Sequence, residues 1–318
     1  MKVSNGILIV GYGKHVEDKI LPAIANLDIP ILGIVSANKN TPRTITRYTN
    51  INEVSELLKP SHVFIASKPN KHLGLIGEAS LISKNLMVEK PIAVKSPVIL
   101  KSKNVKKLKV VTKEAMMYKY NPLNKFLEKR RKIIAEAKRI NVEFIIPTHS
   151  LNKNTSFRQS LGFENNMLFD IGCYIYDFIW SFDLLSENLL SQNKVSFENG
   201  QAKYLMLKSD KNANKKLCFK FGYGQGYSNI VKFTSKYNVS YELKPFFYGR
   251  VSDVIINLSK DSRKFEKVQK NHNCFIKMID EWYFNKKSSI QDQLLNIDRI
   301  SFIQKSISKL SKNWRLNV

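Results

Sequence analysis

Residues 6–16 read GILIVGYGKHV, and this stretch decides the fold of the first part of the chain. Ile7–Val10 is an unbroken apolar run, as in a strand that is buried on both faces. Gly11 and Gly13 follow at the spacing of a tight turn that opens a helix, where backbone N–H groups can bind a pyrophosphate. Val16 stands where a third glycine or alanine is usual. The stretch predicts a dinucleotide-binding turn; the alternative is a strand–helix turn that uses glycine only for its geometry.

The pattern after this turn alternates between strands and helices up to about residue 118. Helical segments are expected at Leu21–Leu27, Val54–Leu58 and His72–Lys84, and strands at Ile31–Val35, Val63–Ser67, Leu86–Glu89 and Val110–Thr112. Such alternation requires right-handed crossovers and a parallel sheet with helices on both faces. We therefore predict an α/β Rossmann domain over residues 1–118.

The pattern changes after Tyr118. We expect a long helix at Pro122–Arg139, a strand at Val142–Pro147 and a helix at Asn166–Phe182, with later helices at Asn271–Phe284 and Ile290–Leu310. Alternating runs at Ala202–Ser209, Lys216–Tyr223, Ile230–Thr234, Val239–Leu243 and Val251–Leu258 are typical of antiparallel strands with one solvated face. Residues 119–318 should form an α+β substrate and oligomerisation domain with an open, mostly antiparallel sheet. A C-terminal helix that packs back on the first domain is compatible with this division.

The composition narrows the class of protein. The chain of 318 residues is 43% hydrophobic, carries a net charge of +26 and has three cysteines. No apolar run reaches membrane-spanning length, and the first strand lacks a cleavage site, so we expect a cytoplasmic protein without membrane insertion. The charge could serve nucleic acid, but the lysines are spread along the chain, with denser clusters only at Lys101–Lys109 and Lys125–Arg139. We expect no nucleic-acid partner; a positive field would attract phosphorylated molecules.

The end of the second strand bears on the choice of cofactor. A carboxylate usually stands there and binds the ribose hydroxyls of NAD. Here the chain reads Val35-Ser36-Ala37-Asn38-Lys39, and Arg43 lies close by. Because no carboxylate would repel a 2′-phosphate and cations could pair with it, the sequence predicts NADP in preference to NAD. The alternative is that Lys39 and Arg43 are loop charges of a lysine-rich protein.

Two further blocks are more specific. Residues 63–72 read VFIASKPNKH, and one helix later residues 88–93 read VEKPIA; this pair resembles the Gfo/Idh/MocA family of oxidoreductases. Residues 114–122, EAMMYKYNP, are similar to the segment that joins the two domains of that family. Phe157-Arg158 and the stretch 168–177, LFDIGCYIYD, match two more of its blocks. The resemblance runs in order from residue 7 to about residue 180.

The resemblance implies roles for matching residues. Lys90 would lie between nicotinamide and substrate, aimed by a cis peptide before Pro91. Tyr174 would act as general acid or base, and Asp170, one helical turn earlier, would orient that pair or bind a substrate hydroxyl. Arg158 would bind the substrate or the carboxamide end of the cofactor.

The complete set of predicted site residues follows from the motifs and the resemblance together. The cofactor-binding set is Gly11, Gly13, Lys14, His15, Ser36, Asn38, Lys39, Ser67, Pro69, Asn70, His72, Glu89, Lys90 and Pro91. The substrate-binding set is Lys90, Tyr118, Arg158, Asp170 and Tyr174, with Asp177 on the same helix face; Lys90, Tyr174 and Asp170 are the catalytic candidates, and no metal site is expected.

Each candidate has a plainer structural alternative. Lys90 could be a surface lysine, and Tyr174 a core aromatic of an apolar helix. His15 and His72 fit loop or helix-cap roles near phosphate or adenine better than catalysis. Cys173 fits a packed thiol.

These features favour an NAD(P)-dependent oxidoreductase that interconverts a secondary alcohol and a ketone on a sugar, sugar acid or nucleotide-linked sugar. The alternative is a catalytically silent nucleotide-binding regulator or sensor of the same fold. Three departures from the family pattern keep it open: Val16, the missing ribose carboxylate, and Glu164-Asn165-Asn166 in place of the usual glycines. Because an open sheet tends to be covered by another subunit, we expect a homodimer or homotetramer.

Overall fold

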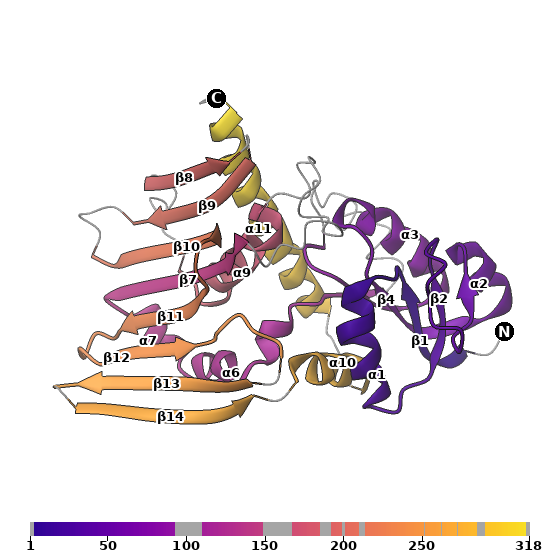
Figure 1. Ribbon diagram of the computed structural model, residues 1–318, viewed down its shortest axis with the longest axis horizontal. Coiled ribbons are helices and arrows are strands. Elements are labelled where there is room, and N and C mark those ends of the chain that lie inside the picture. Colours follow the sequence, from indigo (N-terminus) through magenta and orange to yellow (C-terminus); the bar gives the residue numbers. More distant parts are fainter. Residues whose placement is uncertain are drawn as a thin grey trace. The chain divides into compact units, whose positions relative to one another are not determined.

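The computed structural model describes residues 3–92, 110–148, 167–184, 192–198, 201–209, 214–250, 252–261, 263–271, 273–284 and 290–315. The chain divides into two compact units. The first comprises residues 1–116 and 275–304, and the second comprises residues 117–274 and 305–318. Figure 1 labels the elements of both units.

The first unit contains a six-stranded parallel sheet in the order β3-β2-β1-β4-β5-β6. Its strands are β1 Val3–Val10, β2 Ile31–Val35, β3 Arg47–Tyr48, β4 Lys59–Ile65, β5 Asn85–Val88 and β6 Val111–Glu114. This is the Rossmann order, in which the strand sequence reverses between β1 and β4 and leaves a crevice at their carboxyl ends. The predicted fold of this part is confirmed.

Helices of the first unit come from both ends of the chain. They are the π-helix Val16–Ile20, α1 Leu21–Ala25, α2 Ile51–Leu57, the 3₁₀ turn Pro69–Lys71, α3 His72–Ile82, α10 Cys274–Phe284 and α11 Ile290–Arg315. Residue 274 of α10 and residues 305–315 of α11 belong to the second unit. Ile300 of α11 is buried in the same core cluster as Val88, Ile92 and Val110. The C-terminal helix is therefore part of the packing behind β5 and β6.

The second unit contains an eight-stranded sheet in the order β14-β13-β12-β11-β7-β10-β9-β8. The strands are β7 Arg139–Pro147, β8 Gln192–Glu198, β9 Gln201–Lys208, β10 Lys216–Gly224, β11 Ser228–Thr234, β12 Ser240–Lys244, β13 Ser252–Lys260 and β14 Arg263–Asn271. All neighbours are antiparallel except β7 and β10, which are parallel. The predicted mostly antiparallel sheet is confirmed.

One face of this sheet is buried and the other is open. On β7, Ile140, Val142 and Phe144 are buried, whereas Asn141 and Glu143 are only partly buried. The helices of the unit are the 3₁₀ turn Met117–Tyr120, α6 Pro122–Glu128, α7 Arg131–Ala135, α8 Met167–Asp170 and α9 Gly172–Ser181. Gly172 lies against the sheet so closely that a Cβ there would come 3.0 Å from the Phe221 ring.

The predicted long helix at 122–139 is wrong. The helical segment is interrupted at Arg130, whose φ of −121° and ψ of 24° are not helical. The chain then enters β7 at Arg139, which pairs with Lys216 on one side and Thr234 on the other. Pairing in the centre of the sheet overrides the helical propensity of this lysine-rich and alanine-containing segment.

Strands β8 and β14, at the two edges of the sheet, were not predicted. The nine residues of β14 include four lysines and arginines and are exposed wherever their burial is described. Charged edge strands of this kind lack the alternation that marks a half-buried strand. Within the parts of the chain that the structure describes, no helix is both long and apolar enough to cross a membrane.

Candidate functional site

The glycine turn after β1 has the geometry that the sequence predicts. Gly11 has a φ of +99°, and a Cβ there would come 2.7 Å from the carbonyl oxygen of Ala66. Its N–H donates to the carbonyl of Val35 at 2.8 Å. A Cβ on Gly13, in contrast, would meet no atom within 4 Å. The fold therefore requires glycine at position 11, whereas the space beside Gly13 is open to a ligand.

The helix that follows this turn begins with a widened segment. Residues Val16–Ile20 form a π-helix, and the N–H of Leu21 reaches back to the carbonyl of Val16. Val16 itself is buried. A π-turn inserts an extra residue into a helix. The widened segment lies next to Pro22, which cannot donate a backbone hydrogen bond.

A cation that the sequence analysis did not single out lies beside the end of β2. Arg47, on the neighbouring strand β3, donates from Nη1 to the carbonyl oxygen of Ser36 at 3.2 Å. The Ser36 hydroxyl oxygen accepts from the N–H of Asn38 at 3.0 Å. Asn38 and Lys39 are exposed. Arg47 was missed because the two-residue strand that places it has no signal in the sequence.

His72 holds the backbone after β4 and after β5 together. Its Nδ1 lies 2.9 Å from the carbonyl oxygen of Pro91, and its Nε2 lies 3.0 Å from that of Ser67. Burial lowers the pKa of His72, while the two carbonyls favour its protonated form. Only a doubly protonated ring can donate to both carbonyls. His72 thus links the backbone of two predicted site segments.

His15 and Glu89 form the second link. The His15 Nε2 lies 2.9 Å from Glu89 Oε1 and joins the glycine turn to the segment after β5. Burial opposes charge on both groups, but the pairing outweighs it: the pKa of His15 is raised and the pKa of Glu89 is lowered. The pairing therefore favours the charged forms of both groups.

Lys90 lies between these links. It follows Glu89 directly, is partly buried, and is joined to Pro91 by a cis peptide bond, as the family resemblance implied. Lys14, Pro69 and Asn70 flank the same strand ends: Lys14 is paired with Asp18 at 3.4 Å, Pro69 is buried, and Asn70 is exposed.

In the second unit, two buried carboxylates are each bound by a tyrosine. The Tyr118 hydroxyl donates to Asp177, and Lys119 Nζ lies 3.1 Å from the other oxygen of that carboxylate. The Tyr223 hydroxyl donates to Asp170 Oδ2 at 3.0 Å. Tyr223 and Lys119 were not among the predicted site residues. Tyr223 lies on β10, and only the packing of helix on sheet brings it to Asp170.

Tyr174 lies in an aromatic cluster. Its ring centroid is 5.7 Å from that of Tyr118 and 5.6 Å from that of Phe144, and its hydroxyl lies 3.8 Å from the Met117 sulfur. Cys173 is a buried thiol near the Asp170 carbonyl, in line with a packing role. The predicted Arg158, the block at Glu164–Asn166 and the cluster Lys101–Lys109 lie outside the described residues.

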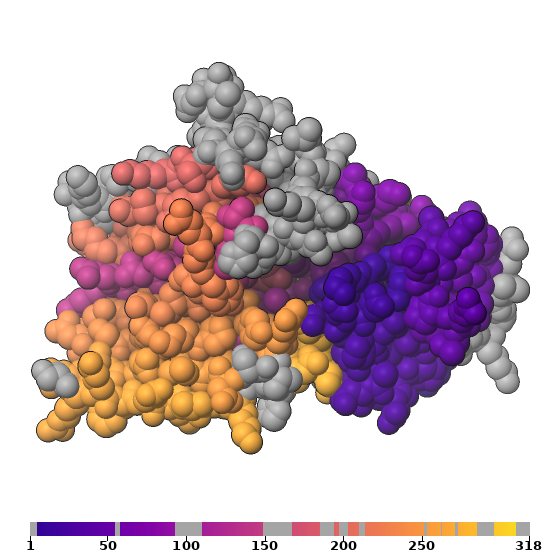
Figure 2. Space-filling model, viewed as in Figure 1, coloured from indigo at the N-terminus to yellow at the C-terminus, as the bar shows by residue number. Residues whose placement is uncertain are grey.

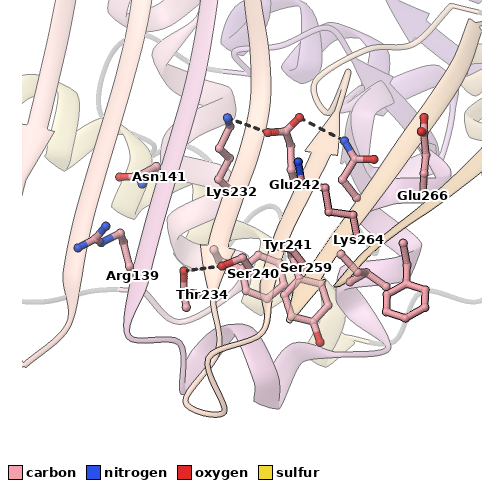
Figure 3. Close-up of a pocket in the computed structure, with 14 residues that line it drawn as sticks. Arg139, Asn141, Lys232, Thr234, Ser240, Tyr241, Glu242, Ser259, Lys264 and Glu266 are labelled. Atoms are coloured by element: carbon pink, nitrogen blue, oxygen red, sulfur yellow. Dashed lines mark hydrogen bonds and ion pairs between the residues drawn. The ribbon is translucent and has the colours of Figure 1, made fainter. Parts of the chain in front are cut away.

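The open face of the second sheet has a hollow of about 630 Å³. Two cross-strand rows of polar side chains line it (Figure 3): one contains Asn141, Lys232, Glu242, Asn257 and Glu266, and the other Arg139, Thr234, Ser240, Ser259 and Lys264. In Figure 2 this face of the sheet is in view, and strands of the second unit form much of the surface that is coloured pink to orange. None of the predicted site residues lines this hollow, so it is a separate feature of the sheet.

Comparison with solved structures supports the fold. The 3-ketoreductase KijD10 from Actinomadura kijaniata, in complex with NADP and TDP-benzene, has a TM-score of 0.76 at 13% identity, over 94% of this chain and 95% of that one. An aldose–aldose oxidoreductase from Caulobacter crescentus complexed with glycerol has a TM-score of 0.76 at 13% identity, over 96% and 98%. A Gfo/Idh/MocA family oxidoreductase from Vibrio cholerae has a TM-score of 0.72 at 15% identity, over 98% and 100%.

No protein-family model and no curated protein sequence matches the chain. The likeness to the solved structures extends over nearly the whole length of each chain, and it confirms the Gfo/Idh/MocA resemblance at the level of the fold. The class that emerges is a Rossmann unit joined to a unit with an open sheet, the architecture of these oxidoreductases.

Proposed function

We propose that this protein is an NADP-dependent oxidoreductase that interconverts a secondary alcohol and a ketone on a sugar, sugar acid or nucleotide-linked sugar. The observation that carries the proposal is the Glu89-Lys90-Pro91 turn at the carboxyl end of β5. This strand is next to β4, which borders the strand-order reversal where dinucleotides bind in this fold. Similar folds include structures in complex with NADP and a TDP-linked ligand.

The residues present fit the cofactor. The open space beside Gly13 would admit a pyrophosphate close to the backbone. The end of β2 offers Arg47 and Lys39 and no carboxylate from residue 36 to residue 48, which suits a 2′-phosphate. When bound, the nicotinamide would supply or accept the hydride.

The side chains would handle the proton. Lys90 would donate a hydrogen bond to the reacting oxygen and favour the negative charge that develops there as a ketone is reduced. Tyr174 would deliver the proton to that oxygen, or remove it in the oxidation direction. Asp170 would bind a substrate hydroxyl, with its orientation fixed by Tyr223.

The test is NADPH oxidation by the wild-type protein with a panel of keto sugars, keto sugar acids and nucleotide-linked keto sugars. NADPH binding is followed separately by the fluorescence of the dihydronicotinamide. The proposal expects tight NADPH binding and turnover with at least one class. Tight binding without turnover across the panel would favour a silent nucleotide-binding regulator instead.

We also propose that the protein forms a homodimer or homotetramer. Its support is the open sheet face, which presents Val268 at 56% exposure on β14 beside the polar rows described above. Sedimentation of the wild-type protein and of Val268→Glu tests it. Dissociation of the variant is expected, whereas a wild-type monomer at micromolar concentration would overturn the proposal.

A further inference from the structure

A buried ion pair lies behind the Lys90 turn. Arg299 Nη2 of α11 is 2.6 Å from Glu114 Oε2 at the end of β6, and their side chains are 8% and 3% exposed. Neither residue was predicted to belong to the site. Arg299 is more than 180 residues from Glu114 in sequence, so no local motif could have indicated the pair.

Asn296, one turn earlier on α11, fixes this guanidinium. Its side-chain oxygen accepts from Arg299 Nε at 3.2 Å and from Nη2 at 2.7 Å. Its side-chain nitrogen donates to the carbonyl oxygen of Thr112 on β6 at 3.0 Å. One turn of α11 thus holds both the backbone of β6 and the carboxylate at its end.

The second oxygen of that carboxylate reaches the turn. Glu114 Oε1 accepts from the N–H of Ile92 at 2.8 Å. Ile92 is two residues after Lys90, and its side chain is 1% exposed. Together with His15 on Glu89 and His72 on Pro91, this bond means that Glu89, Pro91 and Ile92 are each held by a hydrogen bond from another element.

The energetics argue against a purely stabilising role for the pair. Burying two charges carries a desolvation cost, and well-packed apolar residues of similar volume often stabilise a protein as well or better. An apolar pair could not accept the Ile92 N–H. A carboxylate that is itself fixed by a guanidinium fork gives a short, directed, charge-assisted hydrogen bond.

We propose that Arg299 is a positioning residue for Lys90: through Glu114 and the Ile92 N–H, helix α11 sets the backbone that carries the lysine. This rests on the proposed function for the role of Lys90. The hydrogen-bond chain from Arg299 to Ile92 lies wholly within the first unit.

The first test needs no substrate. Arg299→Lys keeps the positive charge but cannot bind Glu114 and Asn296 with one planar fork. The double variant Arg299→Met with Glu114→Gln removes both charges, so that no buried charge is left alone. Amide hydrogen exchange at Ile92 should become at least about tenfold faster in both, because its acceptor is no longer fixed. Competitive acetylation of Lys90 as a function of pH should also change in both.

The matched control is Ile303→Ala, one turn further along α11. It removes buried apolar atoms from the same helix and leaves both members of the ion pair in place. It should lower the unfolding temperature while exchange at Ile92 and acetylation of Lys90 stay as in the wild type, measured where each variant is fully folded.

The second test uses turnover of the substrate found in the panel. Arg299→Lys should lower kcat by up to about 10²-fold, with the Kd for NADPH unchanged within a few-fold, because a small displacement near reacting atoms is costly. Exchange, acetylation and kcat that all match Ile303→Ala would overturn the positioning role. If the wild type turns over nothing, the proposed function fails, and the acetylation and exchange arms still decide whether Arg299 sets the Lys90 turn.

Discussion

The candidate residues of the first unit follow the ends of neighbouring parallel strands, whereas those of the second unit lie on short helices and contact partners that are distant in sequence. In the first unit, Gly11 and Glu89 come directly after β1 and β5, and Ser67 comes two residues after β4. In the second, Asp170 finds Tyr223 across 53 residues and Asp177 finds Tyr118 across 59. A parallel sheet gathers its strand ends at one edge, so sequence order alone brings such residues together. Helix-on-sheet packing gives no such guarantee.

The comparison implies that chemistry in the second unit depends on individual side chains, and Tyr174→Phe probes this most strongly. If the phenol handles the proton, kcat should fall by about 10²–10⁴-fold, because general acid–base catalysis contributes that much. The control is Tyr176→Phe on the same helix, whose phenol is buried and whose pKa is raised by that burial far above neutral pH. Equal rates in the two variants would make Tyr174 a core aromatic only.

The two glycines of the turn after β1 should serve different purposes: Gly11 is needed for the fold, and Gly13 leaves room for the cofactor. Gly11→Ala should lower the free energy of unfolding by about 1–3 kcal/mol, because φ is +99° and a Cβ would clash with Ala66. Gly13→Ala should leave unfolding unchanged and weaken NADPH binding instead. Denaturant unfolding and NADPH titration of both variants check this; equal loss of binding without any stability difference would contradict it.

The end of β2 tests whether Arg47 contributes to cofactor choice. Arg47→Ser should lower the preference for NADPH over NADH about tenfold, because a guanidinium–phosphate pair is lost. Lys59→Ser removes one positive charge at the opposite end of the sheet, where β4 begins, and should change neither affinity. Cofactor titrations measure both. A wild type that prefers NADH would overturn the prediction.

The smallest effect concerns pH. The pKa of His15 is raised above its ordinary 6.5, so its pairing stabilises the fold below that value and is lost as pH rises through the raised pKa. The pKa of Glu89 is lowered from 4.5, so the stabilisation from the same pairing is also lost at low pH, as the pH falls through this lowered pKa. His15→Gln should therefore differ most from the wild type between about pH 4.5 and 6.5, by less than about 1 kcal/mol, since His15 is half exposed. Unfolding measured from pH 4 to 9 tests this; a difference that is constant with pH would contradict it.

The sequence predicted most of the first unit because its strands are buried on both faces and end in turn motifs. β2 was placed residue for residue at Ile31–Val35, and the cis peptide before Pro91 followed from the family resemblance. The sheet of the second unit was recognised from alternation in its inner strands. The lysine-rich edge strand β14 was not predicted, because an exposed edge strand lacks that alternation. The break in the helix after Pro122 was not predicted either, because pairing in the centre of the sheet overrides local helical propensity.

The side chains that support the candidate site were the least predictable. Tyr223 and Arg47 reach predicted site residues, and Arg299 reaches Glu114, only through tertiary packing. Nothing in their own sequence neighbourhoods distinguishes these three from other polar residues. Glu114 stood within a recognised block, yet its partners on α11 and at Ile92 became visible only in the fold.

The central claim is that Lys90 serves hydride chemistry at a bound nicotinamide. The most direct measurement is single-turnover hydride transfer from saturating NADPH to the substrate found in the panel, in Lys90→Ala and in Lys84→Ala, which removes an exposed lysine shortly before β5. We predict that Lys90→Ala lowers this rate by more than about 10²-fold while the Kd for NADPH stays within a few-fold, and that Lys84→Ala changes neither. Transfer in Lys90→Ala within a few-fold of the wild-type rate would contradict the assignment.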